Sequence, residues 1–492
     1  MSRNLSESIA YYQDQRNECL TITLYANILW KDRNVLCLYY GHSLIDEKVD
    51  FLLNLYKDSC DNGKFNARWT LLEILKDLIQ LPDLPNVVDI GQLKDTLIES
   101  QCITKESLIA KLWYIQLNNT NKPTDVVLYG FGRIGRLLAR ELCADPALQV
   151  SLNLKAVVTR DLVDIDFLQR RASLLKKDSI HGSFKGIIEI DEQSNSLIVN
   201  GKQVRFISSQ KPSEIDYSTL GIEGALLIDN TGKYRNKKGL TQHLECNGVS
   251  NVIVTAPGID IQNIVLGVNH TNALNSDFPI FSAASCTTNA ISPVLNIVQS
   301  TYGIVKGHIE TIHAYTNDQN LVDNMHGKAR RGRAAALNMV ITETGAGEAV
   351  SKIIPQLKDK FTSNAIRVPI ANGSLAILVL ELNNKTSVEQ IHQLLMQDRS
   401  SPTKNKQLKV SFDEDLVSSD IIGNAITGIV DGCATSVSKD GYTLTLYVWY
   451  DNEYGYSMQV LGLASWLSNH ICENSERIDH SNVENANLAT FI

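Results

Sequence analysis

Nine cysteines are scattered along this chain of 492 residues, and one of them has neighbours that suit chemistry. Cys286 lies in SAASCTTNAIS, among small and hydroxyl-bearing residues and directly before an apolar pattern of helical spacing. Ser285 is a residue type that caps helix N-termini, and a helix N-terminus lowers the pKa of a thiol and makes it a better nucleophile. A lone cysteine is more often a small buried residue, so the prediction of a nucleophile depends on further groups.

A nucleophilic thiol needs a base, and His313 is the candidate. It lies in ETIHAYTNDQN, at the end of an expected strand. The remaining cysteines are widely spaced and form no C-x-x-C pair, which argues against a disulfide framework and against a zinc site. We therefore expect thiol and imidazole chemistry, with no metal.

A glycine-rich turn forms a second group of residues with a chemical meaning. Gly130, Gly132 and Gly135 make the pattern GFGRIG directly after an apolar strand and at the start of a helical pattern. The first glycine permits a tight turn, the second lets the backbone approach a pyrophosphate, and the third lets the helix pack on the strand. The N–H groups at the start of the helix then face the phosphates. The pattern predicts a dinucleotide site.

The type of dinucleotide depends on the end of the second strand, where both relevant residue types occur. Arg160 would accommodate the 2′-phosphate of NADP, whereas Asp161 would accept a hydrogen bond from the ribose of NAD. NAD is the slightly favoured cofactor, and NADP stays open.

Two kinds of sheet are expected to position these residues. From Asp125, short apolar runs alternate with helical patterns, which is typical of a parallel Rossmann-type sheet with covering helices. GALLIDNTG, NVIVTAPG with Thr255, and PIFSAASC end in small or hydroxyl-bearing residues, at strand ends where ligands bind. After Cys286 the strands become longer and more alternating, which favours an α+β catalytic domain with a mixed or antiparallel sheet. The fold class is therefore α/β.

The first 120 residues read as an all-helical extension. WTLLEILKDLIQL places Trp69, Leu72, Leu75 and Ile79 at helical spacing, and TKESLIAKLWYIQL repeats the pattern before the polar stretch NNTNKPTD. We expect a packing or interaction module here. The predicted domains are a helical extension (1–122), a cofactor domain (123–285 with 452–492) and a catalytic domain (286–451).

Composition limits the classes of partner. Hydrophobic residues make up 43% and charged residues 20% of the chain, as in globular proteins, and the net charge of −8 gives no footprint for nucleic acid. The basic run KARRGRAA is too short to change this. The start of the sequence lacks the order of a signal peptide and no run is long enough to span a bilayer, so a cytoplasmic location without membrane contact is expected.

Seven short motifs give the chain a specific family resemblance. GFGRIGR, ASCTTN, HAYTNDQ, RR-R-AAA, TGA, RVP--NGS and WYDNE-GYS occur in this order between about Asp125 and Ser468. In them the chain resembles phosphorylating glyceraldehyde-3-phosphate dehydrogenase, in the long bacterial branch that carries an N-terminal extension. The resemblance implies oxidation of glyceraldehyde 3-phosphate, with NAD(P) and inorganic phosphate, to 1,3-bisphosphoglycerate in glycolysis or gluconeogenesis. It also implies a homotetramer.

The resemblance assigns roles to residues at matching positions. Cys286 would attack the aldehyde and His313 would act as the base. The substrate and phosphate residues would be Ser285, Thr287, Thr316, Asp318, Arg331, Thr344, Gly345 and Arg367. The cofactor residues would be Arg133 and Ile134 beside the glycines, then Thr231, Gly232, Thr255, Asn452 and Tyr456. Of these, Asn452 would hold the nicotinamide carboxamide and Tyr456 would pack beside the ring.

The chain departs from the family pattern at two positions that leave the thiol and the base intact, and two alternative functions stay open beside the first. Tyr129 stands where the family commonly has asparagine, and Ala290 stands where many members have a second cysteine. One alternative is an erythrose-4-phosphate dehydrogenase, in which water attacks the thioester. Another is a regulatory or scaffold protein that keeps the fold and binds a protein partner through its extension. His181 is assigned to the structure around the cofactor domain.

Overall fold

The computed structural model describes residues 5–40, 42–45, 47–53, 71–81, 84–93, 122–276, 278–397 and 407–470, and two compact units contain them. The first unit comprises Met1–Pro123 with Asp145–Ser151, and the second comprises Thr124–Ala144 with Leu152–Ile492. The predicted split of the second unit into cofactor and catalytic domains stays a prediction. Its residues 471–492 lie outside the described part.

The first unit combines helices with a small sheet. Its elements are α1 (Leu5–Arg33), β1 (Leu36–Tyr39), β2 (His42–Ser43), α3 (Leu71–Gln80), β3 (Val87–Asp89) and α7 (Pro146–Gln149). The sheet order is β2-β1-β3, with β1 antiparallel to β2 and parallel to β3. Helices α1 and α3 contribute Ile22, Leu29, Ile74 and Leu75 to the core of this unit.

The prediction that the extension is all-helical is therefore wrong, because the extension also contains strands β1, β2 and β3. Strands of four and three residues are too short to show a period, and β1 pairs with β3 across a long sequence separation. The helix predicted in WTLLEILKDLIQL is confirmed as α3, which buries Leu71, Ile74, Leu75 and Leu78. The helix predicted in TKESLIAKLWYIQL lies outside the described residues.

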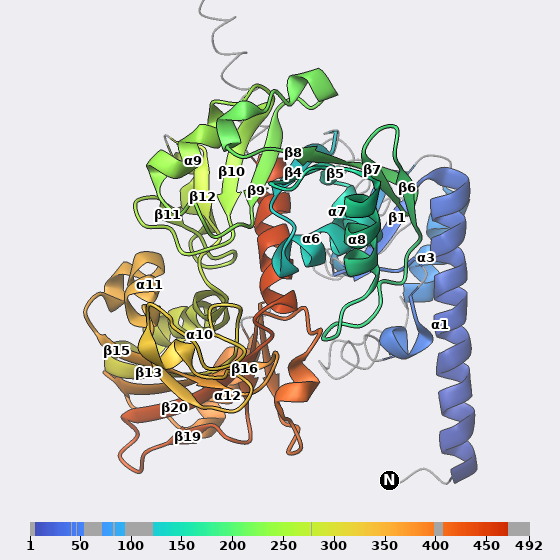
Figure 1. Cartoon of the computed structure of the whole chain (residues 1–492). Coiled ribbons are helices and arrows are strands. Elements are labelled where there is room, and N and C mark those ends of the chain that lie inside the picture. Colours follow the sequence, from blue (N-terminus) through green and yellow to red (C-terminus); the bar gives the residue numbers. More distant parts are fainter. Residues whose placement is uncertain are drawn as a thin grey trace, which may run out of the picture. The chain divides into compact units, whose positions relative to one another are not determined.

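A nine-stranded sheet carries the glycine turn of the second unit. Its order is β11-β12-β10-β9-β4-β5-β8-β7-β6, parallel except around β7. The strands are β4 (Thr124–Tyr129), β5 (Leu152–Thr159), β6 (Ile188–Asp191), β7 (Ser196–Val199), β8 (Lys202–Ser208), β9 (Ala225–Asp229), β10 (Val249–Val254), β11 (Gln262–Asn263) and β12 (Ile280–Ser282). The helices are α6 (Arg133–Ala144), α8 (Ile165–Lys176) and α9 (Lys237–Leu244) (Figure 1). The central strands β4 and β9 are buried as continuous apolar runs, which confirms the predicted Rossmann-type sheet.

A mixed eight-stranded sheet follows, in the order β14-β15-β13-β16-β20-β18-β17 with β19 paired to β20. Its strands are β13 (Ile304–Ala314), β14 (Val340–Glu343), β15 (Phe361–Val368), β16 (Ser374–Leu382), β17 (Leu408–Ser411), β18 (Gly428–Asp431), β19 (Ser436–Val437) and β20 (Thr443–Tyr450). The helices are α10 (Cys286–Tyr302), α11 (Ala346–Ile353), α12 (Val388–Gln397) and a helix over residues 454–470. Short 3₁₀ turns are η1 (Pro212–Glu214), η2 (Ser218–Leu220), η3 (His270–Asn275), η4 (Ala329–Gly332), η5 (Pro355–Leu357) and η6 (Ser418–Ile421).

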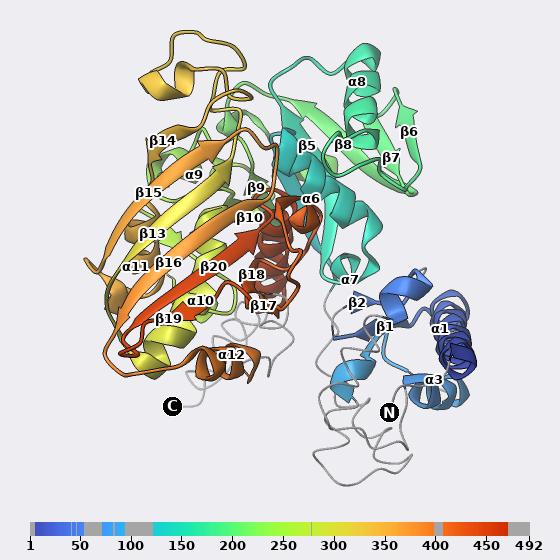
Figure 2. The same cartoon turned by 90° about the horizontal axis from the view of Figure 1, so that it is seen from below.

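The alternating burial in β16 and β20 shows that one face of this sheet is covered. Residues of α10, α11 and α12 pack on it, and Figure 2 shows β13, β16 and β20 side by side. The predicted mixed sheet is confirmed. Among the described residues no helix is long and apolar enough to cross a membrane, and no cluster of His, Cys, Asp and Glu side chains is arranged to hold a metal.

Candidate active site

Cys286 is the first residue of α10, and the preceding turn fixes how its thiol is presented. The predicted N-cap is confirmed, because the Ser285 Oγ accepts a hydrogen bond from the N–H of Thr288 at 3.1 Å. The Asn289 amide donates to the carbonyl oxygens of Ala283 at 2.7 Å and Ser285 at 2.9 Å. Hydrogen bonds between near neighbours in the sequence thus stabilise the turn that carries the thiol.

His313 is the second-to-last residue of β13, and its imidazole faces the Cys286 thiol. Its Nε2 atom is 3.6 Å from Cys286 Sγ, and its side chain is largely buried. Its Nδ1 atom is 2.7 Å from the carbonyl oxygen of Ala314 and 2.7 Å from Nη1 of Arg367. Nδ1 can donate to Ala314 or accept from Arg367, but not both. When it donates, the Nε2 lone pair faces the thiol and can accept its proton.

Burial and charge keep the resting pair neutral. Burial, followed by the positive charge of Arg367, lowers the pKa of His313 to about 3. Burial also raises the pKa of the Cys286 thiol, although Arg367 and a hydrogen bond from Thr287 act against this rise. An anion that bound beside Arg367 would offset the charge that lowers the pKa of His313 and would thereby favour the imidazolium.

Two arginines bring positive charge to this region. Arg367 on β15 is paired directly with His313 on the neighbouring parallel strand β13. Arg331 in η4 donates two hydrogen bonds to Thr342 Oγ1, at 2.8 and 3.0 Å. Arg331 also pairs with the partly exposed carboxylate of Asp318. Thr342 on β14 is paired with Ala365 on β15, two residues before Arg367. Both arginines are therefore attached to the strand pair β14–β15.

The other predicted phosphate residues lie on nearby turns. Thr316 follows β13, and its carbonyl accepts from the N–H of Gln319. Thr344 and Gly345 directly precede α11, where the Thr344 Oγ1 accepts from Ala346 N at 3.3 Å. The hydroxyl of Thr287 is instead 2.8 Å from that of the buried Tyr450. Hence the Thr287 side chain already has a protein partner.

The glycine turn has the space and the backbone that a dinucleotide requires. Gly130 has φ +100°, a conformation that favours glycine, and a Cβ atom on Gly135 would lie 2.5 Å from the Gly130 carbonyl oxygen. A Cβ atom on Gly132 would meet nothing within 4 Å. Gly135 therefore serves helix packing, whereas the open space at Gly132 fits a bound pyrophosphate.

Arg133 begins α6, but its side chain is already engaged. Its guanidinium contacts both carboxylate oxygens of Glu453 at 2.6 Å and those of Asp178 at 3.1 and 3.2 Å. Burial raises the pKa of Asp178, but hydrogen bonds from the backbone N–H groups of His181 and Ile180, followed by the Arg133 guanidinium, lower it to about 2. The predicted contact of Arg133 and Ile134 with a cofactor phosphate would therefore be made by their backbone N–H groups. Sequence reasoning missed Glu453, although the residue lies within the quoted WYDNE-GYS motif.

A buried carboxylate organises the loop with Thr231 and Gly232. Asp229 Oδ1 accepts hydrogen bonds from Thr231 N at 2.8 Å and Thr231 Oγ1 at 2.7 Å, and Oδ2 is 3.1 Å from the buried His243 Nε2. The carbonyl of Asp229 accepts from Thr255 N at 3.0 Å. Sequence reasoning missed Asp229 and His243. The available signal was Asp229 itself, an acidic residue at the end of an apolar strand.

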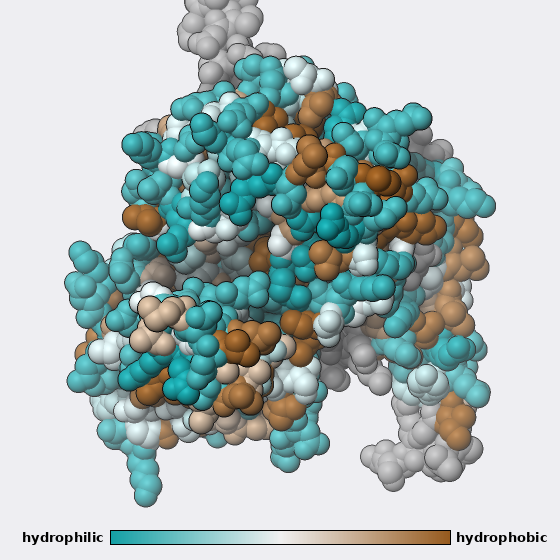
Figure 3. All heavy atoms as spheres, in the orientation of Figure 1, coloured by the Kyte–Doolittle hydropathy of each residue, from teal (hydrophilic) through white to brown (hydrophobic). Residues whose placement is uncertain are grey.

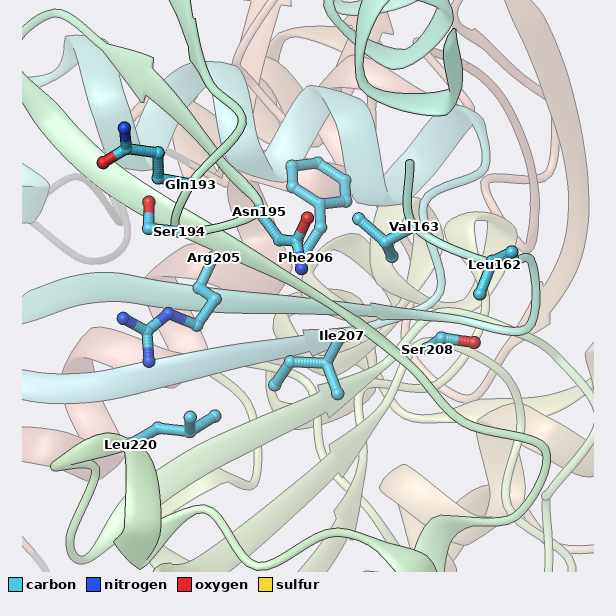
Figure 4. Close-up of a pocket in the computed structure, with 10 residues that line it drawn as sticks. All are labelled: Leu162, Val163, Gln193, Ser194, Asn195, Arg205, Phe206, Ile207, Ser208 and Leu220. Atoms are coloured by element: carbon cyan, nitrogen blue, oxygen red, sulfur yellow. The ribbon is translucent and has the colours of Figure 1, made fainter. Parts of the chain in front are cut away.

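The ambiguous pair at the end of β5 has a defined position. Thr159 ends the strand, so Arg160 and Asp161 come directly after it. Asp161 is largely exposed and pairs with Arg171 at 2.7 Å. The loop continues into a surface pocket lined by Leu162, Val163, Gln193, Ser194, Asn195, Arg205, Phe206, Ile207, Ser208 and Leu220 (Figure 4). This pocket contains neither the thiol nor the imidazole.

The two residues predicted to contact the nicotinamide lie just beyond the end of the eight-stranded sheet. Asn452 Oδ1 accepts from Ser374 Oγ at 2.8 Å, which orients its amide. The Tyr456 hydroxyl donates to the carbonyl of Ala284 at 2.9 Å, two residues before the thiol. Ser374 Oγ also accepts from the N–H of Ala314, so Asn452 is linked to the residue after His313 as Tyr456 is linked to the turn before Cys286.

Comparison with known proteins agrees with this geometry. The family model described as glyceraldehyde 3-phosphate dehydrogenase, NAD binding domain, matches residues 124–237, and the one for the C-terminal domain matches residues 285–452. A glyceraldehyde-3-phosphate dehydrogenase-like protein of Pseudomonas aeruginosa is 45% identical over 443 residues, which is 88% of this chain and 95% of the relative. Glyceraldehyde-3-phosphate dehydrogenase 1 of Bacillus cereus is 36% identical over 346 residues, which is 70% of this chain and 98% of the relative. The glyceraldehyde-3-phosphate dehydrogenase of Borreliella burgdorferi is 37% identical over 349 residues, again 70% of this chain and 99% of the relative.

The match to the Pseudomonas aeruginosa protein covers too much of the chain to stop at Thr124, so it extends into the N-terminal extension. The two family models together cover more than half of the chain. The chain therefore belongs to the glyceraldehyde-3-phosphate dehydrogenase family, and it is an NAD-dependent dehydrogenase.

Proposed function

We propose that this protein oxidises glyceraldehyde 3-phosphate, with NAD and inorganic phosphate, to 1,3-bisphosphoglycerate. The observation that supports the proposal most strongly is the 3.6 Å separation of Cys286 Sγ and His313 Nε2 at the start of α10. Burial raises the pKa of this thiol, and the charge of Arg367 and the helix N-terminus act against that rise.

In the proposed reaction, His313 Nε2 takes the thiol proton, Cys286 Sγ forms a bond with the aldehyde carbon, and the imidazolium returns the proton to the aldehyde oxygen. The resulting thiohemiacetal loses a hydride, and its hydroxyl proton goes to the imidazole, which leaves a thioester. NAD supplies the acceptor for that hydride. Inorganic phosphate then attacks the thioester, the C–S bond breaks, and the acyl phosphate leaves.

The two phosphate groups in this reaction need two anion sites. We assign Arg367 and Thr316 to the substrate phosphate, with Asp318 close to that site, as their family positions suggest. We assign Ser285, Thr287, Thr344, Gly345 and Arg331 to the attacking phosphate. Hydroxyl and backbone donors beside a guanidinium suit the oxygens of a tetrahedral phosphate.

A steady-state assay tests the proposal. The purified protein should reduce NAD with glyceraldehyde 3-phosphate only when phosphate is present, and Cys286→Ser should abolish this activity while NAD binding is retained. Normal NAD binding without phosphate-dependent reduction would contradict the proposal. Oxidation of erythrose 4-phosphate without phosphate would point to the water-dependent reaction instead.

We also propose that the second unit forms a homotetramer, as the family resemblance implies. Leu321, Met325, Leu337 and Met339 are largely exposed in the segment around η4. Val379 on β16 and Ile341 on β14 add exposed apolar groups to the large sheet. Exposed hydrophobic groups of this kind mark protein interfaces. Light scattering should give the mass of four chains, and a monomer would contradict the proposal.

We propose in addition that the extension contacts a protein partner. Ile9, Leu20 and Leu24 are exposed on α1, where Figure 3 shows hydrophobic side chains along the helix. The paired substitutions Leu20→Ser and Leu24→Ser should leave NAD reduction unchanged and remove the interaction. An unchanged set of partners in the variant would argue against this surface.

A further inference from the structure

The chain enters the catalytic helix through a bend that alanine does not favour. Ala284 has φ +55°, in the left-handed region, and lies between β12 and α10 with almost no exposed surface. Asn34, Tyr40, Asn195, Asn200 and Asp359 also have positive φ, but asparagine and aspartate tolerate this region much better than alanine does. An alanine persists there only when its surroundings hold it.

Two side chains form hydrogen bonds with the backbone N–H and C=O groups of Ala284. The N–H of Ala284 donates to Ser282 Oγ at 3.0 Å, and its carbonyl accepts from the Tyr456 hydroxyl at 2.9 Å. Ser282 Oγ also contacts Ala256, Gly258 and Asn263, so it serves the sheet as a whole. The hydrogen bond from Tyr456 is more specific, because its hydroxyl donates to the bend alone.

We propose that Tyr456 is a positioning residue for the Cys286 thiol and acts through its hydroxyl on the Ala284 carbonyl. This inference rests on the proposed function, in which Cys286 is the nucleophile. Without the hydroxyl, Ala284 can relax towards negative φ, and a rotation there redirects Ser285 and Cys286. The thiol then moves away from His313 Nε2, which now lies 3.6 Å from it.

The hydroxyl and the ring of Tyr456 have separable tasks. The family resemblance assigns the ring to packing beside the nicotinamide, and Tyr456→Phe keeps the ring while it removes the hydroxyl. A purely structural role would change the stability of the protein. A positioning role changes the reactivity of one thiol and leaves the affinity for NAD unchanged.

Tyr217→Phe is the matched control. Tyr217 is fully buried in the cofactor domain, and its hydroxyl has no hydrogen-bond partner among the described residues. This control therefore removes a buried tyrosine hydroxyl without removing a hydrogen bond to the thiol turn. Any general effect of the Tyr-to-Phe change should occur in both variants.

Alkylation by iodoacetamide reads out the thiol without substrate or cofactor. In the full-length protein, modification of the Cys286 and Cys433 peptides is followed by mass spectrometry across the pH range in which thiols ionise. Tyr456→Phe should slow alkylation of Cys286 about tenfold at neutral pH and lower kcat similarly. Alkylation of the exposed Cys433, the Kd for NAD and the Tyr217→Phe control should stay unchanged. Equal alkylation of Cys286 in wild type and Tyr456→Phe would overturn the inference.

A rescue variant links the hydroxyl to the bend. Glycine adopts positive φ without a side-chain penalty, so in Ala284→Gly the bend no longer depends on Tyr456. Adding Tyr456→Phe to Ala284→Gly should therefore change Cys286 alkylation less than about twofold. A full tenfold loss in that background would overturn the inference. A wild-type protein without phosphate-dependent NAD reduction would instead contradict the proposed function, and the alkylation comparison distinguishes the two failures.

Discussion

Replacing Glu453 by glutamine should weaken the anchor between the start of α6 and the end of the large sheet. Glu453 makes two contacts of 2.6 Å with Arg133, and only 14% of its side chain is exposed. A hydrogen bond between charged groups contributes about 1.5–3 kcal/mol. Because Arg133 keeps Asp178 as a partner and is itself partly exposed, we expect a net loss of about 2 kcal/mol.

Thermal unfolding and NAD titration measure this effect. A loss of about 2 kcal/mol lowers the Tm by about 4–8 °C in a domain of about 150–250 residues, and by less in a larger unit. The Kd for NAD should rise severalfold, because the N–H groups of α6 lose their fixed position. Glu381→Gln is the control, since Glu381 pairs with Lys306 at 3.1 Å on the surface and should contribute less than about 0.5 kcal/mol. If both variants unfold at the same temperature, the reasoning is refuted.

Further expected outcomes concern the glycine turn and the buried imidazole. Gly135→Ala should destabilise the fold, because the new methyl group meets the Gly130 carbonyl, whereas Gly132→Ala should keep the Tm and weaken NAD binding; equal Tm losses would contradict this. The pKa of His313 is lowered to about 3, so the unfolded chain binds a proton near pH 5 that the folded chain does not. Stability is therefore lost as the pH falls below about 6.5, by about 1.4 kcal/mol per pH unit until about pH 3. Denaturant unfolding should show that His313→Asn loses about 2 kcal/mol less than wild type between about pH 7 and about pH 5, and an equal loss would exclude this role.

The parts of the site that were predictable from sequence are those built from near neighbours. The N-cap at Ser285, the helix that begins at Cys286, and the close approach of Gly135 to Gly130 each involve a few consecutive residues. Alternation of buried residues likewise indicated the long strands of the second sheet. The all-helical interpretation of the extension failed where β1 and β3 pair across a long stretch of sequence.

The sequence by itself determined the chemistry available to this protein: a thiol at a helix start, an imidazole, a glycine turn and a set of phosphate-binding residue types. Only the tertiary structure decided which distant groups act on them. Pairing of β13 with β15 puts Arg367 against His313, while the helix over residues 454–470 brings Tyr456 to the bend before Cys286. Residue spacing reports the period of a strand or helix but not its neighbours, because those depend on packing between elements far apart in the chain.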